Sequence, residues 1–159
     1  MTITAEVVGD REVVAFLDAM PQRVHDALVK KVTVLALQLE AKEKQKLSGD
    51  VLNVVTGRGR RSIFSSVEDD GTAVYGMTAS DGTAPYLAVH EFGGKAAYDI
   101  VPVKAKALHW VSGGKDFFAK IVHHPPAKMR SFARSSLADM RAQIIVGLRE
   151  AVIEGTQAP

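Results

Sequence analysis

Apolar residues recur with a helical period in two long stretches of this 159-residue chain. In the first stretch they are spaced by four, four, three and four residues, which places them on one face of a helix that begins at Pro21 and that Ser48-Gly49 would end. These residues are Val24, Leu28, Val32, Leu35 and Leu39. In the second stretch the same period predicts a helix over residues 127–154, terminated by Gly155. Its apolar stripe consists of Phe132, Ala133, Leu137, Met140, Ile144, Leu148 and Val152.

The chain before Pro21 shows a weaker pattern. Alternation over residues 2–8 predicts a short strand, and Asp10 is a suitable cap for a short helix that runs to Ala19. We expect Met20-Pro21 to break that helix, because proline has no N–H to donate within a helix.

Between the two long helices the pattern changes to the alternation and turn residues of β-strands. Asp69-Asp70-Gly71-Thr72 and Gly113-Gly114-Lys115 are turns of the kind that joins antiparallel strands. Tyr86–Phe92 fits either a helical turn or a strand. The expected strands cover residues 51–55, 63–67, 73–78, 98–103, 107–112 and 117–123. These elements predict an α+β fold, in which an antiparallel β-sheet of about five or six short strands packs against two long amphipathic helices.

Composition limits the classes of protein to which the chain can belong. It shows no break that would mark a boundary, so we expect a single domain over residues 1–159 with a frayed C-terminal tail, 155–159. The absence of cysteine excludes disulfides, thiolate metal sites and cysteine nucleophiles. No stretch approaches the roughly 18 uninterrupted apolar residues of a membrane span, and the N-terminus lacks the features of a signal peptide. The sequence therefore predicts a soluble protein made in the cytoplasm, without a membrane partner.

Positive charge is concentrated in the segment 42–61. This segment has six basic and two acidic residues, a net charge of +4, whereas the whole chain has a net charge of only +2. The basic residues are Lys42, Lys44, Lys46, Arg58, Arg60 and Arg61. The Gly-Arg-Gly-Arg-Arg run lacks the ending of a phosphate-binding loop, so two interpretations remain: a solvated turn, or a contact with DNA or an acidic neighbouring subunit. A small nucleic-acid-binding protein that uses this segment is our alternative hypothesis.

The sequence contains no convincing catalytic or metal-binding set. The stretch after His90 starts like a zinc-protease helix, but no histidine follows four residues on. His123 and His124 point to opposite faces of a strand, although His109 could join one of them across a hairpin. Glu91, between apolar neighbours, is either an acid with a raised pKa or, as we favour, an acceptor of hydrogen bonds from backbone or arginine. A hydrolase built on Glu91 with His90 or His109 is the weakest hypothesis. We expect no catalytic, cofactor-binding or metal-binding residues and no small-molecule substrate.

Short motifs spread along residues 10–154 carry a further signal in their order. They are Lys46-Leu47-Ser48-Gly49, Val51-Leu52-Asn53-Val54-Val55-Thr56-Gly57, Arg60-Arg61-Ser62-Ile63, Tyr86-Leu87-Ala88-Val89-His90-Glu91-Phe92-Gly93-Gly94, Ile100-Val101-Pro102-Val103, Lys106-Ala107-Leu108-His109-Trp110, Val122-His123-His124-Pro125-Pro126 and Ser131-Phe132. This series resembles the gene-product-ten-like family of head–tail joining proteins of tailed phages and prophages. The chain departs from the family at Gly59, Pro126 and Ser131, where an apolar residue, a glycine and a proline are usual.

The resemblance implies a non-enzymatic structural protein of a phage neck or tail, which joins head to tail or completes the tail through protein–protein contacts. It implies a homo-oligomeric ring, with neighbouring neck or tail proteins as partners, and a location in the host bacterial cytoplasm during assembly and then in the virion. The expected docking segments are Val51–Arg61, Gly93–Ala97 and the C-terminus. Arg58, Arg60 and Arg61 would contact a protein partner or DNA.

Overall fold

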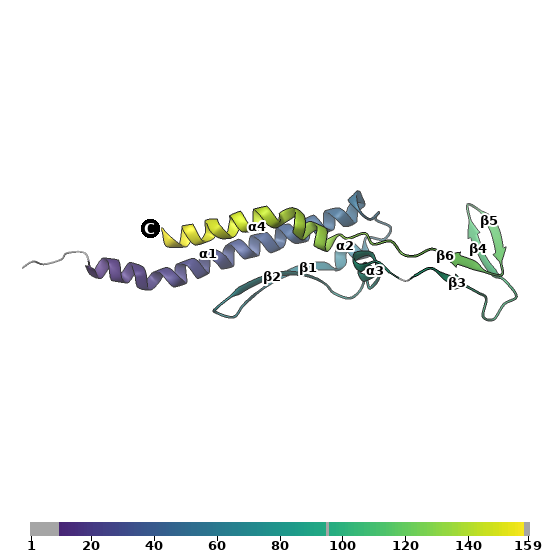
Figure 1. Cartoon of the computed structure of the whole chain (residues 1–159), viewed down its shortest axis with the longest axis horizontal. Helices are drawn as coiled ribbons and strands as arrows, with labels where there is room; N and C mark the ends of the chain where they lie inside the picture. Colours follow the sequence, from purple (N-terminus) through teal and green to yellow (C-terminus); the bar gives the residue numbers. More distant parts are fainter. Residues whose placement is uncertain (1–9, 95, 158–159) are drawn as a thin grey trace, which may run out of the picture.

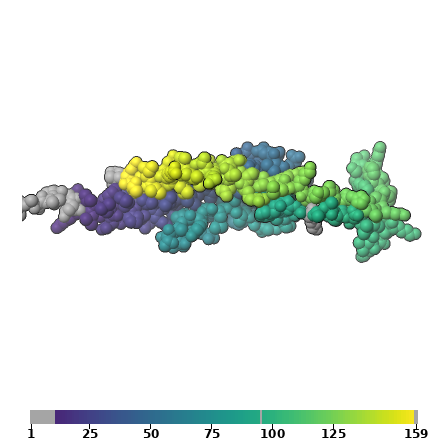
Figure 2. All heavy atoms as spheres, viewed as in Figure 1, coloured from purple at the N-terminus to yellow at the C-terminus, as the bar shows by residue number. Residues whose placement is uncertain are grey.

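The computed structural model describes residues 10–94 and 96–157, so the strand expected over residues 2–8 lies outside the described residues. The fold is α+β, as the sequence predicts, and the molecule is long and narrow (Figure 1, Figure 2). The elements are α1 (Asp10–Gln45), a short wide turn η1 (Lys46–Asp50), α2 (Arg58–Ser62), β1 (Ile63–Asp69), β2 (Val74–Ser80), α3 (Tyr86–Phe92), β3 (Tyr98–Ile100), β4 (Leu108–Ser112), β5 (Lys115–Ala119), β6 (Val122–His124) and α4 (Ala133–Thr156).

The body of the molecule has three layers. Helix α1 lies in the middle, with the antiparallel helix α4 on one side and a ribbon made of β1 and β2 on the other (Figure 1). A small buried core forms where the turn η1, β1, α3 and the start of α4 converge. Its members are Leu47, Ile63, Ala84, Leu87 and Phe132. This core fixes the two long helices, the ribbon and α3 relative to one another.

Helix α1 is continuous through Pro21, contrary to the expected break at Met20-Pro21. A proline inside a helix removes one hydrogen bond of the ladder, the one to the carbonyl of the residue four positions earlier. Here that residue is Leu17, which is more than half exposed, so water can reach this part of the helix. The single lost bond does not outweigh the helical preference of the residues on both sides.

Helices α1 and α4 meet through small residues of α4. Gly147, Ala151 and Gly155 recur every fourth residue and are buried against α1, and a Cβ on Gly155 would lie only 2.5 Å from the Cα of Val24. Gly155 is therefore a packing residue inside the helix, not the expected terminator, and the supposedly frayed tail is helical as far as Thr156. A helix crossing requires small side chains wherever the backbones approach closely, and this requirement decides the position of these glycines.

The predicted apolar stripe of α4 is only partly buried. Met140 and Phe132 are buried, but Leu137 and Val152 are largely exposed. Leu137, Ile144 and Leu148 instead line a groove of about 260 Å³ between α1, α4 and β2. The helix also begins at Ala133, six residues later than expected, because the chain from Pro125 to Ser131 has no regular secondary structure.

The six strands of the described residues form three separate two-stranded antiparallel ribbons, not the single sheet that the pattern suggested. β1 pairs with β2, β3 with β6, and β4 with β5. The strand expected over residues 117–123 is divided at Lys120-Ile121, because its first half pairs with β4 and its second half with β3. The expected strand 51–55 is absent: the N–H groups of Val51 and Leu52 both donate to the carbonyl of Lys46, which holds this segment in a turn.

Residues 96–128, which we call the arm, extend from one end of the body and carry the ribbons β3–β6 and β4–β5 (Figure 1). The arm leaves and re-enters the body at one point, where the N–H of Gly94 donates to the carbonyl of Ala127 at 3.2 Å. Gly93 has a φ of 77°, which favours glycine, and a Cβ on Gly94 would lie 2.7 Å from the side chains of Ala127 and Val89. The Gly93-Gly94 pair is thus required by the geometry at the base of the arm.

Candidate functional site

The three arginines of the basic segment lie on α2, a single helical turn, and not in an irregular loop. The N–H of Arg61 donates to the carbonyl of Gly57, and Gly57 adopts the left-handed conformation that starts the turn. Arg58, Arg60 and Arg61 are all exposed. The short helix therefore presents three guanidinium groups to solvent from a fixed backbone.

The lysines of the same segment are partly neutralised within the chain. Lys44 Nζ lies 2.5 Å from Glu40 Oε1, and Lys46 Nζ lies 2.7 Å from Asp139 Oδ2 on α4. The hydrogen bond from Lys46 lowers the pKa of the Asp139 carboxyl, so this group stays charged. The segment 42–61 thus does not act as one basic surface, since two of its six positive charges are paired with carboxylates of the same chain. Lys44 pairs with Glu40 within α1, and Lys46 of η1 pairs with Asp139 of α4.

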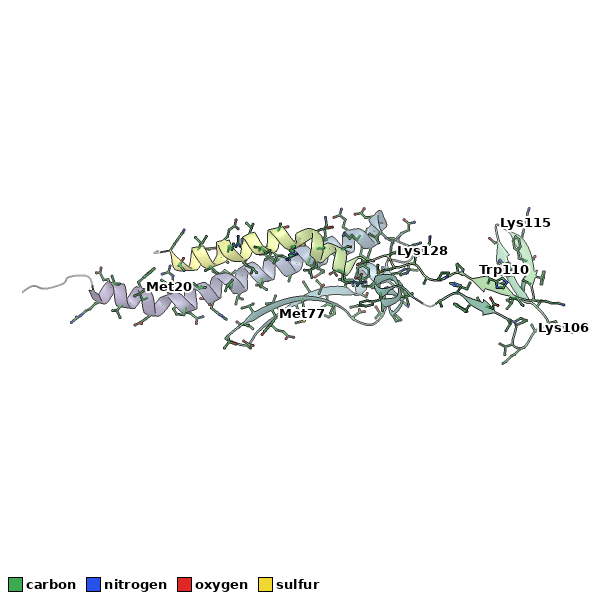
Figure 3. The ribbon with its side chains drawn as sticks, in the orientation of Figure 1. Met20, Met77, Lys106, Trp110, Lys115 and Lys128 are labelled. Carbon is green, nitrogen blue, oxygen red and sulfur yellow. The ribbon has the colours of Figure 1, made fainter. Side chains whose placement is uncertain are left out.

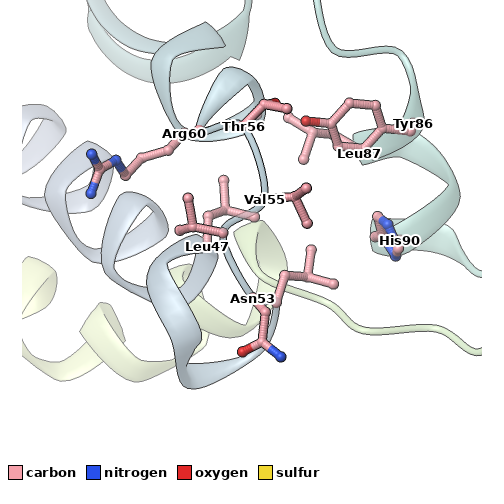
Figure 4. A pocket seen from close by; sticks show the side chains of 12 residues that line it. Leu47, Asn53, Val55, Thr56, Arg60, Tyr86, Leu87 and His90 are labelled. Atoms are coloured by element: carbon pink, nitrogen blue, oxygen red, sulfur yellow. The ribbon is translucent and has the colours of Figure 1, made fainter. Parts of the chain in front are cut away.

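A pocket of about 290 Å³ lies beside α2 (Figure 4). The segment 52–57 forms one wall, and Leu47, Tyr86, Leu87 and His90 form the others. Its lining is mainly apolar and Asn53 lies at its edge, while the side chain of Arg60 points away from the other lining side chains, with Nη1 3.4 Å from Ser48 Oγ (Figure 4). Val55, in the wall, is almost fully exposed. The docking segment expected over Val51–Arg61 therefore combines an exposed apolar loop with an adjacent hollow.

Gly59, where the resemblance leads us to expect an apolar residue, lies at the contact between α2 and α3. It is buried, and a Cβ there would lie 3.0 Å from the Tyr86 hydroxyl oxygen and 3.1 Å from Leu87 Cδ2. A larger apolar residue would displace α3 from its contact with α2. Ser131, a second departure, donates its hydroxyl to Glu91 at 2.8 Å, a hydrogen bond that a proline could not make.

Glu91 caps the N-terminus of α4 from a distant part of the chain. Its carboxylate accepts hydrogen bonds from the backbone N–H groups of Phe132, Ala133 and Arg134 at 2.7–3.0 Å, and from Arg134 Nε at 3.0 Å. Burial raises the pKa of Glu91, but the hydrogen bonds outweigh it and lower the pKa to about 2. Glu91 is therefore ionised at neutral pH and holds the first turn of a helix, as we favoured. The alternative of an acid with a raised pKa is wrong.

The histidines are not gathered at one point. His90 lines the pocket beside α2, whereas His109 lies on the arm and bonds to Asp116 at 2.6 Å. In the ribbon β3–β6, the side chain of His123 bonds to that of Asp99 opposite it, and the ring of His124 stacks on that of Tyr98 opposite it. Within residues 10–94 and 96–157, no three His, Asp or Glu side chains are arranged to hold a metal ion. In the same ranges, no helix has both the length and the apolar character that crossing a membrane requires.

The most unusual property of the molecule is the amount and kind of surface that it exposes. The surface area is 11821 Å², whereas a compact protein of 17.1 kDa exposes about 7,800 Å². The twelve residues outside the described ranges add at most about 1,900 Å², so body and arm account for the rest of the excess. Large apolar side chains are exposed on both long helices, on the ribbon β1–β2 and on the arm.

The arm carries four exposed aromatic side chains, those of Tyr98, Trp110, Phe117 and Phe118. On β4–β5, Trp110 stacks on Phe117 and His109 stacks on Phe118, with ring centroids 5.6 and 4.7 Å apart. Trp110 belongs to one of the motifs found in the sequence, but the two phenylalanines were not singled out there. The sequence feature that could have indicated this exposed surface is the pair Phe117-Phe118 within one expected strand. Consecutive residues of a strand point to opposite faces, so a ribbon without a covering layer must expose one or both of these rings.

The chain matches no protein-family model, and comparison with curated proteins and with solved structures found no match.

Proposed function

We propose that this chain is a non-enzymatic structural protein of a tailed phage or prophage, which joins head to tail or completes the tail through protein–protein contacts as part of a ring. The observation that supports this most strongly is the surface. Without the contribution of the twelve residues outside the described ranges, body and arm still expose about 9,900 Å², against about 7,800 Å² for a compact protein of equal mass, and the exposed side chains include many large apolar ones. Contiguous apolar surface on a folded protein marks sites of association. The order of motifs described above supplies the phage assignment.

An elongated body with a projecting arm suits an assembly component. Contacts between two different surfaces of identical subunits repeat around an axis and close into a ring when the rotation allows. The chain would assemble in the host bacterial cytoplasm and remain in the neck or tail of the virion. Copies of itself and neighbouring neck or tail proteins are the proposed partners.

The test is the absolute mass in solution, measured by light scattering after size exclusion over a concentration series, together with capture of the portal and tail proteins from the same genome. We expect a discrete oligomer, or a mass that climbs with concentration, and retention of at least one of those proteins. A strict monomer that retains none of them would refute the proposal.

Nucleic-acid binding remains the second candidate, because three arginines are exposed on the single turn α2. It predicts DNA binding whose salt dependence weakens when Arg58, Arg60 and Arg61 are all replaced by glutamine. DNA affinity that is unchanged in the triple variant would exclude this role for α2.

A further inference from the structure

We propose that the arm of one copy docks on the outer face of the β1–β2 ribbon of a second copy, so that copies join head to tail. This inference rests on the proposed function, since it specifies how the chain would contact itself. The two surfaces differ, and the contact would repeat from copy to copy.

The arm has the properties of an element that lacks its partner. A two-stranded ribbon is at best marginally stable in water unless another layer covers it. Both faces of β4–β5 are open: Trp110 is 42% exposed on one face, and Phe118 is 69% exposed on the other. Aromatic side chains of this size contribute most to protein interfaces when they become buried.

The ribbon β1–β2 offers a matching surface. Its inner face packs on α1, where a Cβ on Gly76 would lie 2.8 Å from Val32 and where Thr78 donates to Glu43 at 2.7 Å. The alternate positions therefore face solvent. They include Phe64, Tyr75 and Met77, all exposed, and Glu68 directly opposite Tyr75 in the register.

The charges of the two surfaces are complementary. Residues 96–128 contain five lysines and two aspartates, a net charge of +3 with neutral histidines. Lys106, Lys115 and Lys128 are spread from the far end of the arm to its base (Figure 3). Residues 63–80 contain no lysine or arginine. Of their three carboxylates, Glu68 lies on the outer face and Asp70 in the exposed turn, whereas Asp69 lies on the inner face and contacts His25 of α1. Opposite charges on two surfaces favour their encounter and fix which surfaces meet.

The ribbon carboxylates keep their charge. Hydrogen bonds from the hydroxyl and N–H of Thr72 lower the pKa of Asp70. Glu68 is exposed on the outer face itself.

A contact between arm and ribbon must join two molecules. The turn of the ribbon points along α1 away from the arm, which extends from the other end of the body (Figure 1). At its base the arm is held by the hydrogen bond from the N–H of Gly94 to the carbonyl of Ala127, and it points away from the turn of its own ribbon (Figure 1). A contact between two unlike surfaces on separate copies produces a closed ring or an open filament.

The experiment uses two charge variants of the full chain. The arm variant K104E/K106E/K120E changes exposed lysines outside the strands, and the ribbon variant E68K/Y75K changes the outer face. A control matched to the arm variant, K30E/R141E/R149E, makes the same change in net charge as that variant on exposed positions of α1 and α4. Far-UV circular dichroism first establishes that all variants are folded. Mass is then measured over a concentration series, and the emission of Trp110, the only tryptophan, reports burial of the arm.

We expect the wild type and the control to associate with a blue shift of Trp110 emission. Each test variant alone should associate at least tenfold more weakly. An equimolar mixture of the two should regain both association and blue shift, because the unchanged arm of the ribbon variant can then dock on the unchanged ribbon of the arm variant. If the arm variant loses association while the ribbon variant keeps it, the arm docks elsewhere and the inference is wrong. A blue shift that appears only on addition of duplex DNA also overturns it.

The outcomes separate this inference from the proposed function. If the wild type associates and both variants associate equally well, the arm–ribbon contact is wrong while assembly by protein–protein contacts stands. If the wild type is monomeric at every concentration, the contact between copies is overturned, and capture of portal or tail proteins alone decides the proposed function.

Discussion

Replacing Glu91 by glutamine tests the central polar interaction of the body. The carboxylate is 5% exposed and accepts hydrogen bonds from three consecutive backbone N–H groups at the start of α4, together with Ser131 and Arg134. Its pKa of about 2, against an ordinary value of 4.5, means that the folded state favours the charged form by about 3 kcal/mol. Glutamine keeps one acceptor oxygen but turns an NH₂ group toward donors. We expect Glu91→Gln to lower the free energy of unfolding at pH 7 by about 3 kcal/mol.

The pH dependence gives the sharper signature. A folded-state pKa below the unfolded value supplies stability that is fully present above pH 4.5 and is lost as the pH falls toward 2. The difference between wild type and Glu91→Gln should therefore shrink from about 3 kcal/mol at pH 7 to about 1.5 kcal/mol at pH 3. Urea denaturation followed by circular dichroism at 222 nm measures both values. Taking the difference between two chains removes the contributions of the other carboxylates.

Glu68→Gln is the matched control, because it makes the same chemical change on an exposed position of the ribbon. It should change the free energy of unfolding by less than about 0.5 kcal/mol at both pH values. A Glu91→Gln effect below about 1 kcal/mol at pH 7, or one that does not vary between pH 7 and 3, would refute the assignment of Glu91 as the cap of α4.

Three further changes test the packing of α1. Burial of Glu43 raises its pKa despite the hydrogen bond from Thr78, so the folded state loses stability as the pH rises above 4.5. Glu43→Gln should therefore raise the urea midpoint more at pH 8 than at pH 5. An equal change at both pH values would contradict this. Gly155→Ala should lower stability by about 1–3 kcal/mol, because its Cβ meets the backbone of Val24; an unchanged thermal midpoint would show that α4 can move away freely. Pro21→Ala restores a hydrogen bond of the helix, worth up to about 3 kcal/mol, and should slow hydrogen exchange of residues 11–25 at least tenfold; unchanged exchange rates would mean that the proline costs this helix nothing.

Elements defined by neighbours in the sequence were predictable. The apolar period from Val24 to Leu39 and the Asp-Gly turn at Asp70-Gly71 depend on local geometry alone, and the structure has both a helix and a hairpin there. Which strands share a sheet, in contrast, depends on contacts between segments that are distant in the sequence. The alternation correctly predicted strands, but each of the described strands pairs with only one other strand, so the prediction of a single sheet was wrong.

The wrong sequence predictions concern residues whose type fits two different structural roles. Gly155 has the character of a helix terminator, yet it stands where two helices cross, and a single sequence does not distinguish the two. The β-branched run from Val51 to Val55 has strand character, but the carbonyl of Lys46 holds its first N–H group in a turn. The candidate surface was foreseen only in part: Arg58 to Arg61 stood out by charge, whereas the importance of Phe64 and Phe118 depends on which ribbon faces remain uncovered.

The meeting of the two ends of the arm at Gly94 and Ala127 makes it an insertion in the topological sense. The chain leaves the body and returns to the same place, so the number of residues between these points places no strain on the helices or the ribbon. Lengthening such an excursion costs only the slowly growing entropy of closing a longer loop. The reach and the chemistry of the arm can therefore be altered, or the whole excursion replaced by a short turn, while the framework that holds it keeps its own packing.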